Sequence, residues 1–252
     1  MEEPSLVRQL LDPEPDEGLS PGERRGFGCV PWGRLDMILV SVLAIVSQIV
    51  LAPMGLAAVA NMGLGSSADA SLDFFVQVIF LYSLLVSSIW LVGVRRHGAS
   101  WESLGFRPVD LRSLAGLLGL LATVIIVANI AVRSIAHLGL AQDPFIFGHQ
   151  PRQALLMAVL ILVAAPFAEE VFFRGFLLQG LARRMRFWPA AVITSGIFAL
   201  AHVWPYLYVP IFILGLALAW LFWRTGSIWA SVAAPATINA TSLVVVAVLY
   251  SR

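Results

Sequence analysis

The chain has 252 residues, of which 59% are hydrophobic and only 12% are charged, and its formal net charge is +1. Soluble domains carry about a quarter charged residues, so this composition excludes an ordinary soluble protein and indicates an integral membrane protein. The near-zero net charge points to no class of partner. No basic–aromatic stripe is present that would support nucleic-acid binding.

Residues 1–34 differ from the rest of the chain, because they are acidic, rich in Pro and Gly, and contain no long apolar run. They have too little to bury and are predicted to be a disordered cytoplasmic tail. No apolar segment precedes Leu35, so this stretch is not a signal peptide. Residues 35–252 are predicted to form one transmembrane helical domain.

From Leu35 onward the hydropathy separates about seven apolar segments. Unpaired backbone groups in lipid cost several kcal/mol, so each span must be helical. The predicted fold is therefore all-α, a polytopic transmembrane bundle of seven to eight spans, with the stretch SWESLGFRPVDL as the candidate for a re-entrant or amphipathic eighth piece. The expected spans are residues 36–60, 73–94, 112–135, 154–182, 187–204, 207–224 and 227–250.

Arginine placement predicts the orientation of these spans. Alternate loops are rich in arginine, and the loops between them contain only Arg152. The positive-inside rule therefore predicts a cytoplasmic amino terminus. Lysine is absent from the chain, which is typical of a GC-rich bacterial genome and favours a bacterial plasma membrane. The loop arginines are Arg8, Arg24, Arg25 and Arg34, then Arg95, Arg96, Arg107 and Arg112, then Arg183, Arg184, Arg186 and Arg224.

The sequence EEVFFR places charge inside the fourth predicted span. Ionisable residues within membrane spans are rare and functional by default. Glu170 and Arg174 are i and i+4 on one helix face, in the favourable acid-first order, and are predicted to pair. Glu169 points about 100° away from Glu170. It is expected to face a cavity, where it could act as a general base.

Two further polar residues lie in the last spans, and both are expected at the depth of Glu169. Glu169 and His202 are equidistant from the RRMR turn between the fourth and fifth spans, each roughly 25 Å along its helix. Asn239 lies roughly 20 Å into the last span, measured from the same side. Phe198 precedes His202 by one turn on the same face. A carboxylate, an imidazole and an amide are therefore predicted to meet.

Each of these residues also has a structural explanation. Glu170 and Arg174, or Glu169 itself, could belong to a buried structural ion pair. His202 alone would more often be an interfacial histidine. Asn239 alone would more often form a hydrogen bond between helices. The shared depth favours the common site.

Residues 154–245 resemble the CPBP family of intramembrane proteases, which includes type II CAAX prenyl proteases and bacteriocin-processing or self-immunity proteins. The family motif E-E-x-x-x-R is matched by Glu169, Glu170 and Arg174, and F-x-x-x-H is matched by Phe198 and His202. The third motif, H-x-x-x-N, is matched only at Asn239, because Pro235 occupies the histidine position.

The resemblance implies a role for each matched residue. Glu169 would be the base that activates water, His202 its partner, and Asn239 an oxyanion donor, while Glu170, Arg174 and Phe198 support the site. Proline at position 235 has neither a side-chain donor nor an amide proton. Losing one preorganised oxyanion donor typically costs about 10²–10³ in rate.

The sequence favours an intramembrane endopeptidase of CAAX protease type that acts on membrane-associated or lipidated proteins or peptides. One histidine and two divergent carboxylates are too few for a catalytic zinc, which takes three protein ligands. A metal-free mechanism without a cofactor is therefore expected.

Two other hypotheses remain open. A catalytically degenerate family member, acting as a membrane binding or scaffold protein, would fit Pro235. A transporter that uses Glu169 as a proton or ion site would instead spread its polar groups along a path.

Overall fold

The structure is a computed structural model and describes residues 27–47, 70–109, 151–202 and 205–250. Within these ranges every regular element is helical, as the apolar segments predict. The α-helices are α2 (Arg34–Val46), α4 (Ala70–Ile89), α6 (Pro151–Val159), α7 (Ala165–Glu170), α8 (Gln179–Ala182), α9 (Phe187–Leu200), α10 (Tyr208–Thr225) and α11 (Ile228–Tyr250). The π-helical segments are η2 (Trp90–Val94), η5 (Leu160–Ala164) and η6 (Val171–Leu178), and the 3₁₀ turns are η3 (Arg95–His97), η4 (Trp101–Leu104) and η7 (Pro205–Leu207).

Several of the predicted spans can be compared with these helices. Among the described residues, three helices are long and apolar enough to cross a membrane: Phe74–His97, Ala154–Ala182 and Tyr208–Thr225. Helix α9 is apolar but shorter. The predicted span 112–135 and much of 36–60 lie outside the described residues, so the number of seven to eight spans stays a prediction. The candidate eighth piece contains the 3₁₀ turn η4.

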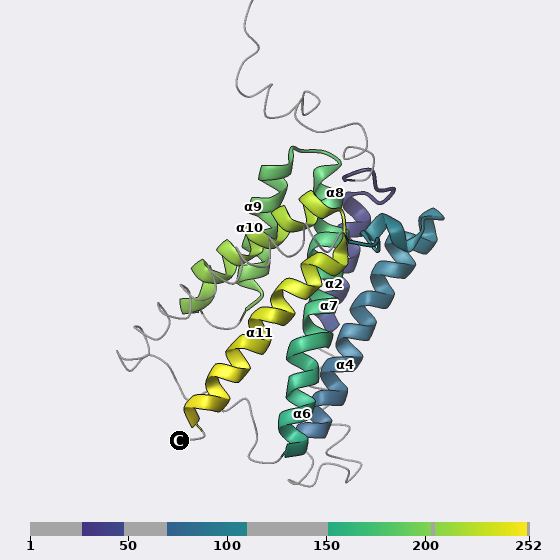
Figure 1. The fold of residues 1–252 in the computed structure, drawn as a ribbon. Coiled ribbons are helices and arrows are strands. Elements are labelled where there is room, and N and C mark those ends of the chain that lie inside the picture. Colours follow the sequence, from purple (N-terminus) through teal and green to yellow (C-terminus); the bar gives the residue numbers. More distant parts are fainter. Residues whose placement is uncertain (1–26, 48–69, 110–150, 203–204, 251–252) are drawn as a thin grey trace, which may run out of the picture.

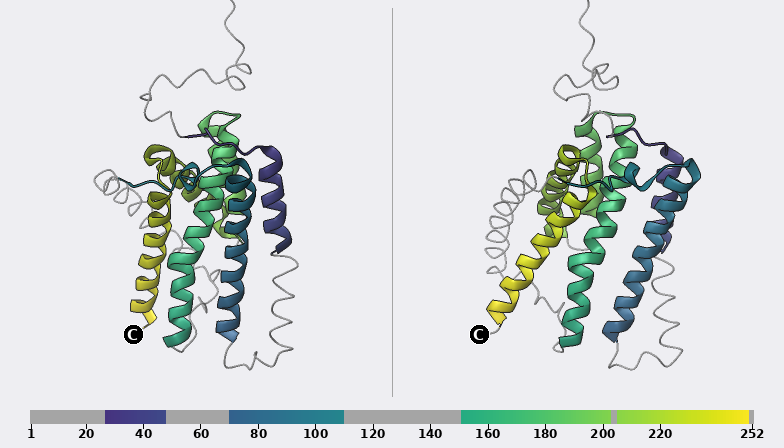
Figure 2. Two further views of the ribbon diagram at one scale, coloured as in Figure 1. Left: turned by 90° about the vertical axis from the view of Figure 1, so that its right-hand side faces the viewer. Right: turned by 45° about the vertical axis from the view of Figure 1, so that its right-hand side comes forward.

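One long helix, composed of α6, η5, α7, η6 and α8, occupies the centre of the described structure. Helix α4 packs on one side of it and α11 on the other (Figures 1 and 2). The antiparallel hairpin of α9 and α10 packs against its η6 segment. The central helix therefore contacts every long helix that carries a predicted site residue.

The central helix widens into π-helical segments on both sides of α7, the segment that carries Glu169 and Glu170. Pro166 supplies a cause for the first, because it cannot donate to the carbonyl of Leu162 and its ring crowds that carbonyl. π-Bulges occur often at functional sites. The sequence predicted a continuous helix here but not its widening.

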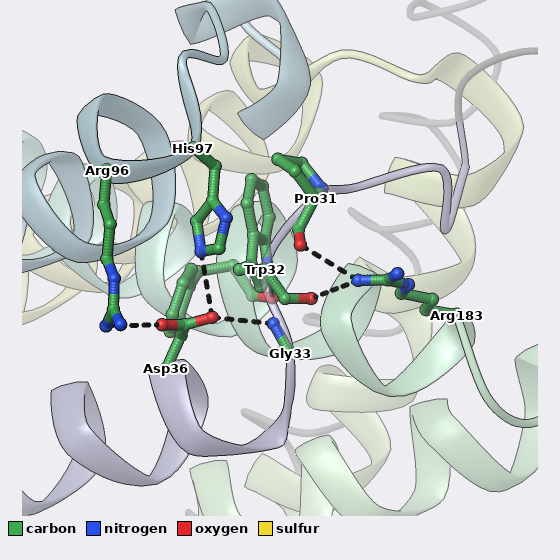
Figure 3. Close-up of polar contacts among 8 residues, drawn as sticks. Pro31, Trp32, Gly33, Asp36, Arg96, His97 and Arg183 are labelled. Atoms are coloured by element: carbon green, nitrogen blue, oxygen red, sulfur yellow. Dashed lines mark hydrogen bonds and ion pairs between the residues drawn. The ribbon is translucent and has the colours of Figure 1, made fainter.

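The chain is already packed before the predicted boundary at residue 34. Trp32 is fully buried, stacks on Phe176, and donates from Nε1 to the Phe176 carbonyl at 3.0 Å. Arg183 donates to the carbonyls of Pro31 and Trp32 (Figure 3). Phe27 also packs against the rings of Phe187 and Phe222. The packed part of the chain therefore begins no later than residue 27. Residues 1–26 of the predicted tail lie outside the described residues.

A polar cluster fixes the start of α2 next to this segment (Figure 3). Asp36 accepts from the Gly33 amide at 2.9 Å and from Arg96 Nη1 at 3.3 Å, and His97 Nε2 lies 3.0 Å from its Oδ2. The cluster ties α2 to the 3₁₀ turn η3.

We expect Gly215→Ala to destabilise the protein by about 1–3 kcal/mol, the usual cost of overpacking. A Cβ at this position of α10 would lie 2.9 Å from the Cβ and 3.1 Å from the Cα of Ser195 in α9, so the two helices would have to separate. Gly196→Ala is the matched control, because a Cβ there meets nothing within 4 Å, and it should stabilise by roughly 0.5–1 kcal/mol. Chemical unfolding in detergent micelles measures both variants. Equal changes in the free energy of unfolding of the two variants would contradict this close packing of α9 and α10.

Candidate functional site

Glu170 and Arg174 form the ion pair that their spacing predicted. Arg174 Nη1 donates to Glu170 Oε1 at 2.6 Å, and the two side chains are 2% and 1% exposed. Arg174 also donates from Nη2 to the carbonyl of Gly215 at 3.1 Å. The arginine therefore links the central helix to α10.

The first two motifs are in direct contact. The guanidinium of Arg174 lies 4.6 Å from the centre of the Phe198 ring, a separation at which a cation is attracted to the face of an aromatic ring. The rings of Phe198 and His202 are 4.9 Å apart, edge to face. Glu170, Arg174, Phe198 and His202 thus form one continuous series of contacts from the central helix to the end of α9.

His202 is held in a defined orientation. Its Nδ1 lies 2.8 Å from the Phe198 carbonyl oxygen. A carbonyl can only accept, so Nδ1 carries the hydrogen of this bond and Nε2 is the ring nitrogen left for other chemistry. The histidine lies two residues after Leu200, the last residue of α9, and is half-buried.

The relative level of Glu169 and His202 follows from a neighbouring contact. Phe173 and Phe198 pack edge to face, with ring centres 5.0 Å apart. Glu169 lies four residues before Phe173, and His202 lies four residues after Phe198. Because the two helices run antiparallel, both residues lie about one turn beyond this contact in the same direction.

Glu169 has a partner that the sequence did not indicate. The Tyr82 hydroxyl, contributed by α4, hydrogen-bonds to its carboxylate. Glu169 is half-buried, whereas Glu170 is buried. The signal in the sequence was one phenol in the span 73–94, which also contains polar residues such as Gln77 and Ser83, so it was too weak to single Tyr82 out.

Asn239 makes a hydrogen bond between helices. Its Nδ2 donates to the carbonyl of Ile161 at 2.9 Å. This is the structural role considered for it, and it uses one of the two hydrogens on the amide nitrogen. Ile161 precedes Glu169 by eight residues, roughly 12 Å of helix rise. The contacts therefore join Asn239 to the central helix but not directly to Glu169 or His202.

The third-motif proline lies inside α11 and is buried. It removes the helical donor to the Ser231 carbonyl. Buried side-chain oxygens without a hydrogen-bond partner among the described residues include Glu170 Oε2, Ser195 Oγ and Ser231 Oγ. Buried polar atoms normally have a partner in the protein or in ordered water. We therefore expect ordered water to bind these oxygens between the helices.

No three His, Cys, Asp or Glu side chains within the described ranges lie together as metal ligands would. In a comparison with protein families, residues 151–241 match the model of type II CAAX prenyl endopeptidases, Rce1-like. Neither the curated proteins nor the solved structures contain a match to the chain. The matched region contains every predicted site residue and excludes Tyr82. The match over residues 151–241 is thus to the family that the two complete motifs indicated.

Proposed function

We propose that the protein is an intramembrane endopeptidase that hydrolyses a peptide bond in a membrane-associated protein or peptide. The observation that carries the proposal is the contact between the two complete motifs, through Arg174 and Phe198, inside a domain of a prenyl endopeptidase family. Ionisable groups within a membrane bundle are costly and are retained for function.

In the proposed mechanism, Glu169 takes a proton from a water molecule as that water attacks the peptide carbonyl. The Tyr82 hydroxyl orients the carboxylate and leaves lone pairs on both oxygens for the water. His202 accepts this proton from Glu169 at Nε2, the nitrogen left free because Nδ1 donates to the Phe198 carbonyl, and passes it to the leaving amine as the peptide C–N bond breaks. Asn239 anchors itself to Ile161 with one amide hydrogen and offers the second to the developing oxyanion.

The ion pair of Glu170 and Arg174 has a supporting role. It is buried, joins the central helix to α10, and positions the Phe198 ring on which His202 packs. The proposed chemistry uses only side chains and water.

A degenerate family member that binds membrane peptides without cleaving them is the second candidate. Two observations favour it: proline stands at the third-motif histidine position, and Asn239 already has a structural hydrogen bond. Purified protein incubated with a library of transmembrane peptides, some of them prenylated, separates the candidates. Product masses that disappear in His202→Ala support the peptidase.

Restoring the missing donor should raise the rate. We expect Pro235→His to increase turnover by about 10²-fold, the lower end of the effect of one oxyanion donor. Pro235→Ala is the matched control, because it restores the backbone amide without adding an imidazole. Cleavage by Pro235→His but not by the unmodified protein would show that the unmodified protein is a catalytically degenerate family member. No cleavage by any of the three proteins would overturn the peptidase.

A further inference from the structure

A pocket of about 220 Å³ lies at the arginine-rich end of the bundle, away from the candidate catalytic residues. Its wall combines the loop after η4, the end of the central helix and the turn between α10 and α11. The lining residues that matter here are Phe27, Glu102, Arg107, Phe222, Trp223 and Arg224.

The frame of the pocket is fixed by hydrogen bonds between segments distant in sequence. The Ile228 amide donates to the Gly105 carbonyl at 2.7 Å, and Ser227 Oγ donates to the Arg107 carbonyl at 2.6 Å. Gly105 has a φ of +92°, and a Cβ there would lie 2.5 Å from the Phe222 ring. The loop bearing Arg107 is therefore held tightly against the start of α11.

Two guanidinium groups line this pocket and form no ion pair with another described residue. Arg107 and Arg224 are both exposed. Neither belongs to the ion pairs found among the described residues, which join Arg96 and His97 to Asp36 and Arg174 to Glu170. Arginine favours phosphate because its planar fork matches two phosphate oxygens.

The position of the pocket favours a lipid as the source of that phosphate. Arg224 lies in the last turn of α10, where an apolar span ends, and such ends lie at the level of the lipid headgroups. Phe27, Phe222 and Trp223 add aromatic surface, and tryptophan is enriched at this level. The carboxylate of Glu102 repels further negative charge in the pocket. A phosphodiester, with one negative charge, is therefore favoured over a phosphate ion, which carries more.

We propose that this pocket binds the phosphodiester of a phospholipid headgroup, with Arg107 and Arg224 as its two ligands. The site is separate from the peptidase chemistry and does not depend on it. Bound lipid would brace the loop after η4 against the turn between α10 and α11.

The test is lipid retention by the full chain in detergent, measured by native mass spectrometry with phosphatidylglycerol and with diacylglycerol of the same acyl chains. At about 1 kcal/mol per arginine, Arg107→Gln/Arg224→Gln should weaken phosphatidylglycerol binding roughly 30-fold. Arg184→Gln/Arg186→Gln is the matched control, because these two exposed arginines lie at the same end outside the pocket lining. The control should retain the lipid, and diacylglycerol should bind neither variant nor the unmodified protein tightly.

Three results would overturn the proposal. Equal losses in the two double variants would show diffuse attraction to the whole arginine-rich surface. Undiminished binding by Arg107→Gln/Arg224→Gln would place the lipid elsewhere. Inorganic phosphate that displaces phosphatidylglycerol at equal concentration would make this a site for free anions. Thermal unfolding of each variant without added lipid checks that the fold is retained.

Discussion

Glu169→Gln should lower peptide cleavage by about 10²–10⁴-fold, the range that general base catalysis contributes. Glutamine has almost the same shape and still accepts the hydrogen bond from Tyr82, but it cannot take a proton from water. The thermal unfolding temperature should therefore stay close to that of the unmodified protein. Steady-state cleavage of the best peptide from the library, together with thermal unfolding, measures both quantities.

Glu169→Asp is the matched variant for this prediction. It keeps the carboxylate but withdraws it by one methylene, so it should retain more activity than Glu169→Gln. If Glu169→Gln cleaves within about tenfold of the unmodified protein, a contribution far below that of a general base, another group must activate the water. A loss of activity that merely follows a loss of folded protein would give Glu169 a structural role.

Local spacing predicted the parts of the site that lie along one helix or across one hairpin. Glu170 and Arg174 pair because residues four apart share a helix face. Phe198 and His202 pack edge to face for the same reason. The short turn between the central helix and α9 sets their antiparallel register, and the contact of Phe173 with Phe198 follows from it.

Contacts between segments far apart in the sequence could not be predicted in this way. Tyr82 reaches Glu169 from α4, which lies beside the central helix only because of how the bundle packs. Trp32 is buried against Phe176, although its surroundings in the sequence are typical of a disordered tail. Hydropathy averages over a segment and does not identify the one aromatic residue that finds a partner.

The sequence pattern also did not predict the π-helical segments of the central helix. Pro166 could have indicated a local irregularity, since proline disturbs the preceding turn. Nothing in the residues from Val171 to Leu178 distinguishes a π-helical segment from an ordinary α-helix. The sequence therefore did not fix the direction in which the side chains of this segment point, and Arg174 is one of them.

Breaking the buried pair of Glu170 and Arg174 should have the largest effect on stability. We expect Arg174→Met to lower the free energy of unfolding by about 3–5 kcal/mol, because it leaves the buried carboxylate of Glu170 without its cation. Glu170→Gln should cost a similar amount, since Arg174 then keeps only the Gly215 carbonyl and a neutral amide. Chemical unfolding in micelles measures these changes.

The double variant Glu170→Leu/Arg174→Met separates charge burial from packing. Both charges are removed at once, so the double variant should recover most of the stability lost in either single variant. Arg96→Met is the matched control, because Arg96 also pairs with a carboxylate but its side chain is 64% exposed, and it should cost less than about 1 kcal/mol. If the double variant is as unstable as the singles, the arginine acts mainly through its contacts with Phe198 and Gly215. A stable double variant that no longer cleaves peptide would instead mean that the pair is retained to position His202, at no net gain in stability.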